Sequence, residues 1–206
     1  AWRGREGKVE VGLAPPAPYA VSPPLLKRLA EWARAEGLPL MVHAAESPEE
    51  VAFLARGEGP LREVYGRFAK TPWTPPGTTP VRHLHALGVL GPTTLLVHGV
   101  QVDEEEAGLL AETGTKVVLC PRSNANLEVG EAPLALYAKH GVELALGTDS
   151  RGSSPDLDVK NEARFLWGRA EPRLLVRALT RGGYRALGLP TPRLTRGTPL
   201  SLVHFL

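Results

Sequence analysis

The segment Thr94-Leu-Leu-Val-His98, followed by Gly99, is a short apolar run that ends in a histidine. Four more apolar runs of similar length occur along the chain, at residues 9–14, 38–43, 116–120 and 142–146. Each is almost continuously apolar instead of alternating with polar residues, a pattern typical of strands buried on both faces of a parallel sheet. The sequence therefore predicts five parallel strands.

Segments with helical spacing lie between these strands. We predict helices over Pro23–Glu36, 61–68, 80–87, 103–112, 132–140 and 157–167. The first is marked most clearly, because Ser22 suits the N-cap, Pro23 suits the first turn and Gly37 suits the C-terminal end. Strands that alternate with helices form right-handed βαβ units, which leaves two folds, a doubly wound sheet or a (β/α)8 barrel.

Polar residues follow several of these strands at the point where each strand ends. They are His43, His98, Ser123 with Asn124, and Asp149. In a (β/α)8 barrel the carboxyl ends of the strands form the face on which the active site is built. This placement favours the barrel over the doubly wound sheet.

Composition excludes several classes of protein. The chain has 206 residues, of which 43% are hydrophobic, and a formal charge of +2 that is spread along the sequence. It is thus long enough to bury a core, and no basic stretch indicates nucleic-acid binding. The apolar runs fall far short of the ~20 residues of a membrane span, and a single Cys excludes a disulfide framework and favours the cytoplasm. The absence of Ile and the excess of 18 Arg over 6 Lys suit a GC-rich genome, and the 20 Pro with a single Gln suit a thermophile.

The polar residues at the strand ends suit metal-assisted hydrolysis. Taken singly, each has an ordinary explanation, since a histidine after a strand is more often a hydrogen-bonded rim residue and Asp149 suits a turn. Together with Glu46, three residues after His43, they occur at the ends of successive predicted strands, and this combination favours a shared active site over separate ordinary roles. Imidazole and carboxylate are suitable zinc ligands, and a nearby carboxyl group can move the protons of a metal-activated water.

Four motifs extend this interpretation. They are Met41-Val-His-Ala-Ala-Glu46, Leu96-Val-His-Gly-Val100, Cys120-Pro-Arg-Ser-Asn124 and Leu146-Gly-Thr-Asp-Ser150. In order and spacing they resemble the amidohydrolase superfamily, and within it the branch of metal-dependent deaminases and chlorohydrolases. The resemblance covers roughly residues 9–198. It implies a hydrolase acting on C–N bonds, with a small purine- or pyrimidine-like substrate, an adenine-type nucleoside such as aminofutalosine or S-adenosylhomocysteine being favoured.

The resemblance also implies a role for each site residue. His43 would be a metal ligand, and Asp149 a metal ligand that also shuttles a proton. Glu46 would be the general acid and base, and His98 would contact the attacking oxygen or the tetrahedral intermediate. Ser123 and Asn124 would support the site or contact substrate. The implied cofactor is one zinc, or another divalent metal such as iron, per site.

The chain departs from the family where a His-x-His pair ends the first strand, since the earliest histidine here is His43. If 9–14 is the family's fourth strand, residues 1–190 form about five of eight βα units and 191–206 start a small C-terminal β-sandwich. We then expect the missing N-terminal strands to come from the same or another chain, a homodimer included. Residues 13–16 offer no ligand that could bridge two metals, which favours a mononuclear site and hence deamination or dehalogenation of a ring. The resemblance favours deamination of these two, because nucleobase-like substrates are the commoner ones in this branch. Pro16 stands where relatives often have a substrate-contacting His, so the substrate does not transfer by analogy.

Other residues have competing explanations. Trp73 suits stacking on a substrate ring or packing on its own loop, and Arg122 and Arg151 are expected to be solvated. His83 and His85 suit packing at the surface or against a loop, and Cys120 suits a small buried hydrophobe. Two further functions stay open beside the deaminase. One is an inactive barrel fragment that acts as a structural or binding subunit, and the other is a chlorohydrolase or cyclic amidase acting on a non-purine substrate.

Overall fold

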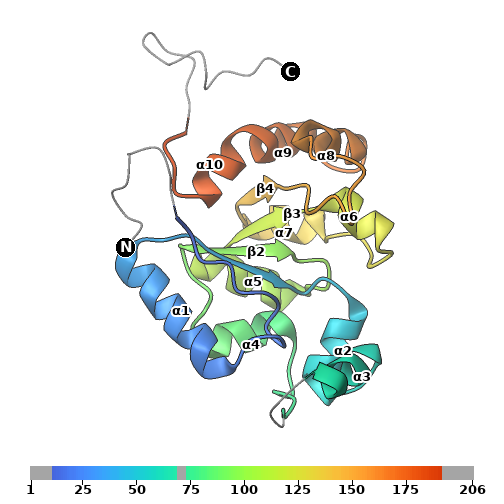
Figure 1. Cartoon of the computed structure of the whole chain (residues 1–206). Helices are drawn as coiled ribbons and strands as arrows, with labels where there is room; N and C mark the ends of the chain where they lie inside the picture. The colour runs from blue at the N-terminus through green and yellow to red at the C-terminus, as the bar shows by residue number, and fades with distance from the viewer. Residues whose placement is uncertain (1–10, 69–72, 192–206) are drawn as a thin grey trace.

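The computed structural model describes residues 11–68 and 73–191, and their centre is a four-stranded parallel sheet (Figure 1). Its strands are β1 (Leu40–Ala44), β2 (Thr94–His98), β3 (Lys116–Leu119) and β4 (Leu144–Leu146). Their order in the sheet is their order in the chain. A doubly wound sheet reverses direction at a switch point, whereas a barrel adds each strand beside the previous one. The protein is therefore an α/β fold with the sheet of a partial (β/α)8 barrel.

The predicted strand at 9–14 is reduced, within the described residues, to a single parallel bridge. Leu13 pairs with Leu40, and its N–H donates to the Pro39 carbonyl at 2.8 Å while its carbonyl accepts from the Met41 N–H at 2.8 Å. The expectation of a full strand is wrong for residues 11–14, because the prolines at 15 and 16 have no N–H with which to continue the ladder. Residues 9 and 10 lie outside the described part. The bridge has the predicted place, beside β1.

Helices connect and flank the strands. They are α1 (Pro23–Glu36), α2 (Pro48–Arg56), α3 (Pro60–Phe68), α4 (Pro80–Ala86), α5 (Glu104–Thr113), α6 (Pro121–Asn126), α7 (Leu134–His140), α8 (Val159–Phe165), α9 (Pro172–Arg177), the π-helix η1 (Ala178–Gly182) and α10 (Gly183–Ala186). The six predicted helices are confirmed, with ends that differ by at most a few residues. The helices α2, α6, α9, η1 and α10 were not predicted.

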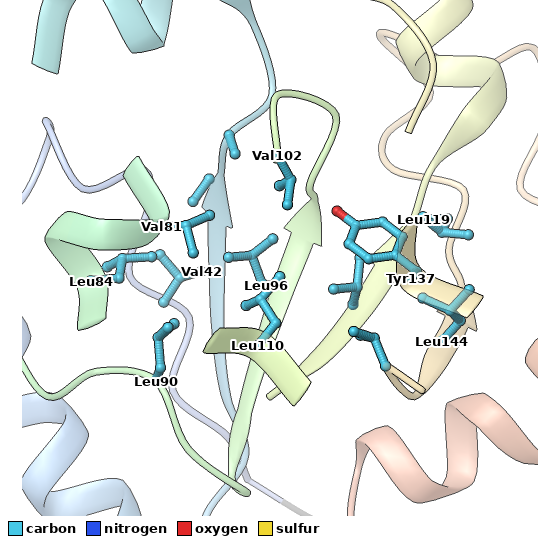
Figure 2. Close-up of a cluster of buried hydrophobic side chains, with 14 of the residues drawn as sticks. Val42, Val81, Leu84, Leu90, Leu96, Val102, Leu110, Leu119, Tyr137 and Leu144 are labelled. Atoms are coloured by element: carbon cyan, nitrogen blue, oxygen red, sulfur yellow. The ribbon is translucent and has the colours of Figure 1, made fainter. Parts of the chain in front are cut away.

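The core lies between the sheet and the helices that cover one of its faces (Figure 2). Val42, Leu96 and Leu144 point from the strands toward this layer, where they meet Leu110 of α5 and Tyr137 of α7. All five are at most 4% exposed. Burying one such aliphatic side chain contributes roughly 1.5–3 kcal/mol to the stability of the folded state. This apolar layer therefore holds the strands in register.

The free edge of β4 is covered by η1. The ladder to β3 uses the carbonyl of Glu143 and the N–H of Gly147, so by alternation the Leu144 carbonyl points away from β3. Gly182 lies against this carbonyl so closely that a Cβ built on it would be 2.1 Å from the oxygen. Only a residue without a side chain permits this approach of helix to strand.

The remaining predictions of chain organisation concern residues that the structure does not describe. The predicted start of a β-sandwich over 191–206 lies outside the described part, apart from Thr191. The division at residue 190 thus stays a prediction. In the described ranges 11–68 and 73–191, no helix has both the length and the apolar character needed to cross a membrane.

Candidate active site

The polar residues predicted from the strand ends lie along the carboxyl edge of the sheet. His43 lies in β1 and Glu46 in the turn that follows, while His98 is the last residue of β2. Ser123 and Asn124 lie in α6, directly after β3, and Asp149 follows β4. Because the strands are parallel, all of these residues lie at one end of the sheet.

His98 is the centre of this group. The residue as a whole is 1% exposed, and its ring centroid lies 5.5 Å from that of His43. The Nδ1 atom lies 2.9 Å from Oδ1 of Asn124, and Nε2 lies 3.6 Å from Oε1 of Glu46. An amide oxygen can only accept, so with this amide orientation Nδ1 carries a hydrogen. Nε2 then faces the Glu46 carboxyl group, and because 3.6 Å is longer than a direct hydrogen bond, a proton would pass between the two groups through one water molecule or after a closer approach.

Asp149 is held by three donors. The hydroxyls of Ser123 and Ser153 donate to Oδ2 at 2.7 and 2.8 Å, and the Ser150 N–H donates to Oδ1 at 2.7 Å. Burial alone raises the pKa of this carboxyl, but the three hydrogen bonds and the nearby His98 outweigh it and bring the pKa below its ordinary value. Asp149 is therefore ionised at neutral pH.

His43 is held in the opposite state. Burial and the neighbouring His98 lower its pKa below the ordinary value, although Asp149 and Glu46 act in the other direction. The imidazole is therefore neutral at pH 7, which is the form that ligates metals. The influence of all three neighbours on His43 also shows that the predicted residues lie within electrostatic reach of one another.

Backbone strain is concentrated at this edge. Ala45, His98 and Asp149 have φ values of 54°, 75° and 60°, in the left-handed region that residues with a side chain rarely adopt. In the described ranges the other non-glycine residue with a positive φ is Glu128. Strain of this kind costs on the order of 1–3 kcal/mol per residue and is typical of functional sites.

The described residues fit a metal site in part. His43 and Asp149 are donors of the right chemistry and protonation state at one edge of the sheet. Among residues 11–68 and 73–191, however, no group of three or more His, Cys, Asp and Glu side chains is arranged to hold a metal ion. Two donors are fewer than the three protein ligands of a catalytic zinc site.

Trp73 packs within an aromatic cluster. Its ring stacks on Phe53 with centroids 4.2 Å apart and also contacts Tyr65 at 5.5 Å. Tyr19 completes the cluster, with its ring 5.9 Å from that of Phe53 and nearly perpendicular to it. Among the described residues, the ring contacts of Trp73 are thus with α2 and α3 and not with its own loop, and its stacking on a substrate ring stays a prediction.

Arg122 was expected to be solvated, and this was wrong. Its guanidinium makes two hydrogen bonds to Asp156, at 2.9 and 2.8 Å, and the side chain is only 14% exposed. Its backbone N–H donates to Oε2 of Glu162 at 3.0 Å, and Glu162 is fully buried in α8. The turn that carries Ser123 and Asn124 is therefore anchored to α8. Arg151, by contrast, is exposed as expected.

Two residues near the site escaped the sequence analysis, Ser153 and Glu50. Ser153 was missed because a lone serine after Asp149 carries no signal. Glu50 is 3% exposed and its Oε2 accepts the Glu46 N–H at 2.8 Å. A signal for it existed, since Ser47-Pro-Glu-Glu50 has the Ser-x-x-Glu spacing of a helix capping box.

A cavity of about 580 Å³ lies beside the site. Asn124 lines it together with Leu119, Phe165 and Arg169, but His43, Glu46 and Asp149 do not. It therefore borders on the candidate site through one residue, the partner of His98.

Comparison with known proteins agrees with the sequence motifs. A model of the amidohydrolase family matches residues 2–205. The chain is 42% identical, over 95% of its length, to an aminodeoxyfutalosine deaminase of Deinococcus radiodurans, and covers 50% of that protein. It is 34% identical, over 99% of its length, to a 5-methylthioadenosine/S-adenosylhomocysteine deaminase of Archaeoglobus fulgidus, and covers 47% of it.

Comparison with solved structures also finds a deaminase. A zinc-bound adenosine deaminase from Xanthomonas campestris is 30% identical and superposes with a TM-score of 0.73, over 91% of this chain and 40% of that one. The chain thus spans about half the length of the curated relatives that it matches. Because the family model matches nearly every residue and the sheet is that of a partial barrel, this chain belongs to the amidohydrolase family.

Proposed function

We propose that these 206 residues form the carboxyl-side share of a metal-dependent aminohydrolase active site, which deaminates an adenine-type nucleoside such as aminofutalosine or S-adenosylhomocysteine. Relatives at 34–42% identity are named as deaminases of such compounds, which supports the proposal. The observation that carries it is the contact of Glu46 with His98, 3.6 Å apart at the carboxyl edge of the sheet. A carboxyl group beside an imidazole suits the proton transfers of a hydrolysis.

In this proposal His43 and Asp149 hold one zinc, or another divalent metal such as iron, together with donors outside the described residues. The pKa shifts of the two side chains support this, because a neutral imidazole and an ionised carboxylate are the forms that bind metals. When bound, such a cation lowers the pKa of a water molecule toward ~7.

The chain's own residues would move the protons. Deamination adds water at the ring carbon that bears the amino group and releases ammonia, so one proton goes to the ring nitrogen and another to the leaving amine. Glu46 would carry the first, and Asp149 would take part in the second. His98 would orient the attacking oxygen, with its ring fixed by the hydrogen bond to Asn124.

An inactive barrel fragment that serves as a binding subunit is the second candidate. It is favoured by the two metal donors of the described residues, which are too few for catalysis. The experiment uses the longest natural polypeptide that contains this chain, loaded with zinc. Ammonia release is measured with 5′-deoxyadenosine, 5-methylthioadenosine, S-adenosylhomocysteine and aminofutalosine as substrates.

Release of ammonia from one or more of these nucleosides, lost in His43→Ala together with the zinc, is the expected result. A folded, zinc-loaded protein that releases ammonia from none of them would overturn the proposal and favour the binding subunit. Chloride release from a chlorinated triazine, in a parallel assay, would indicate the chlorohydrolase instead.

A further inference from the structure

Glu50 is a buried acid in the first turn of α2, and the proposed chemistry does not use it. Its side chain has no cationic partner among the described residues, and Oε1 is buried with no hydrogen-bond partner there. Burial raises the pKa of this carboxyl from 4.5 to about 7, against the effect of hydrogen bonds from the N–H groups of Glu46 and Ala45. Burying a carboxyl group without a full set of hydrogen-bond partners destabilises the folded state, so its presence here calls for a structural or functional explanation.

Helix capping alone does not account for Glu50. In an ordinary capping box the third residue of the helix bonds to the backbone N–H of the N-cap residue. The helix α5 of this chain has that arrangement, with Oε2 of Glu106 accepting the Asp103 N–H at 3.0 Å. At α2 the N-cap is Ser47, yet Glu50 bonds to the N–H of the residue before it, Glu46, at 2.8 Å.

The other side of the same turn is held by the loop after β2. The Ala45 carbonyl accepts the N–H groups of Val100 and Gln101 at 2.7 and 2.8 Å, and the Ala44 carbonyl accepts that of Gly99 at 3.2 Å. Ala45 itself has the strained φ of 54°. The turn would relax from this conformation unless both sides were fixed.

We propose that Glu50 is a positioning residue, whose carboxyl oxygen holds the strained turn at Ala45 and Glu46 and thereby sets the Glu46 carboxyl group against His98. The catalytic part of this inference rests on the proposed function. The role is that of a hydrogen-bond acceptor and does not require a negative charge. Gln supplies an amide oxygen at the same place and thus performs it, whereas Met, of similar length, does not.

The test compares Glu50→Gln, Glu50→Met and the control Glu49→Met in the longest natural polypeptide that contains this chain. Glu49 is the exposed acid next to Glu50 in the same turn of α2. Hydrogen exchange of the Glu46 backbone amide reports on the turn without any need for activity. Steady-state kinetics report kcat and KM separately.

In Glu50→Met we expect the Glu46 amide to exchange about tenfold faster or more, and kcat to fall by a similar factor with little change in KM. Glu50→Gln recovers both quantities, and Glu49→Met leaves them as in wild type. The proposal is overturned if folded Glu50→Met keeps slow exchange or full kcat, or if Glu50→Gln behaves like Glu50→Met. Should Glu50→Met not fold, Glu50→Gln decides, since fast exchange of its Glu46 amide would exclude the acceptor role and slow exchange would support it.

If the proposed function is wrong but the role of Glu50 in the turn is right, the two measurements give different answers. In that case the wild type releases no ammonia from any nucleoside, while the exchange of the Glu46 amide still responds to Met and Gln as expected.

Discussion

Oε1 of Glu46 lies 3.6 Å from Nε2 of His98, although the two residues come from the ends of neighbouring strands and lie 52 positions apart in the chain. The pair is asymmetric in exposure, since the His98 side chain is 2% exposed and that of Glu46 is 29% exposed. Of the two, Glu46 is therefore the one that can meet both solvent and a bound substrate. This asymmetry favours Glu46 as the proton carrier and His98 as the fixed partner.

We expect Glu46→Gln to lower turnover by ~10²-fold or more while the metal content is unchanged, because an amide cannot exchange the proton that general acid–base catalysis needs. Ammonia release and elemental analysis measure the two quantities. Glu49→Gln, which removes an exposed charge three residues away, should leave both as in wild type. Wild-type turnover in Glu46→Gln would remove this residue from the chemistry.

Ser123→Ala should raise the pKa of Asp149 toward its ordinary value, since it removes one of the hydrogen bonds that favour the ionised form. Because the folded-state pKa of Asp149 is depressed, its contribution to stability is present above the unfolded-state pKa of 3.8 and is lost as the pH falls through the folded-state pKa. The variant loses part of that contribution. Carboxyl NMR titration of the metal-free protein measures the shift.

The matched control is Ser150→Ala. Ser150 reaches Asp149 through its backbone N–H, which an alanine keeps. An equal change of the Asp149 pKa in both variants would show that the Ser123 hydroxyl is not its cause.

The raised pKa of Glu50 gives a pH dependence of stability with a definite sign. Between the unfolded-state value of 4.5 and the folded-state value of about 7, the folded protein binds the proton more tightly. The contribution is therefore complete below pH 4.5 and is lost as the pH rises through about 7. Glu46 and Tyr19 are the ionisable groups beside this carboxyl, and both would favour its neutral form when charged.

Glu50→Gln abolishes this loss. We expect its free energy of unfolding, relative to wild type, to increase between pH 4.5 and pH 8 by up to about 3 kcal/mol, as measured by urea denaturation. Glu49→Gln should show no such trend. A difference between Glu50→Gln and wild type that is independent of pH would contradict the prediction.

Gly182→Ala should destabilise the protein by about 2–3 kcal/mol, because the new Cβ would meet the Leu144 carbonyl oxygen at 2.1 Å and η1 would have to move away from β4. Gly183→Ala is the control. A Cβ at that position meets nothing within 4 Å, and its φ of −59° is helical. Equal unfolding midpoints for the two variants would show that η1 does not pack on β4 as described.

The strands could be predicted from sequence because their signal is local. Continuous apolar runs mark the four strands of the sheet, and in β2 both predicted ends are those observed. The segment 9–14 carries the same signal, but pairing also requires N–H groups, and the prolines at 15 and 16 remove them. The helix α6 was missed because Pro121-Arg-Ser-Asn-Ala-Asn126 is short and poor in strong helix formers.

The placement of the candidate site residues was also predictable from sequence, whereas their roles stay predictions. The rule that polar residues at the carboxyl ends of parallel strands meet at one edge accounts for the placement of His43, His98 and Asp149. The contacts that hold these residues in place were less predictable. The Ser-x-x-Glu spacing marks Glu50 only as a residue of the first turn of α2, and nothing in it shows that the side chain accepts the Glu46 N–H. The contact of Glu162 with the Arg122 N–H depends on how α8 lies against the turn after β3, which no local pattern indicates.

The order of the strands has a consequence for the folding pathway. The connection from β2 to β3 contains only α5, and that from β3 to β4 contains α6 and α7, whereas the one from β1 to β2 contains α2, α3 and α4. Loop closure costs more entropy as the loop grows, and contacts that are distant in sequence form later. We therefore expect β2, β3 and β4 to associate before β1. Since β1 brings His43, and the turn after it brings Glu46, we expect the described part of the site to form only when β1 joins the other three strands of this sheet.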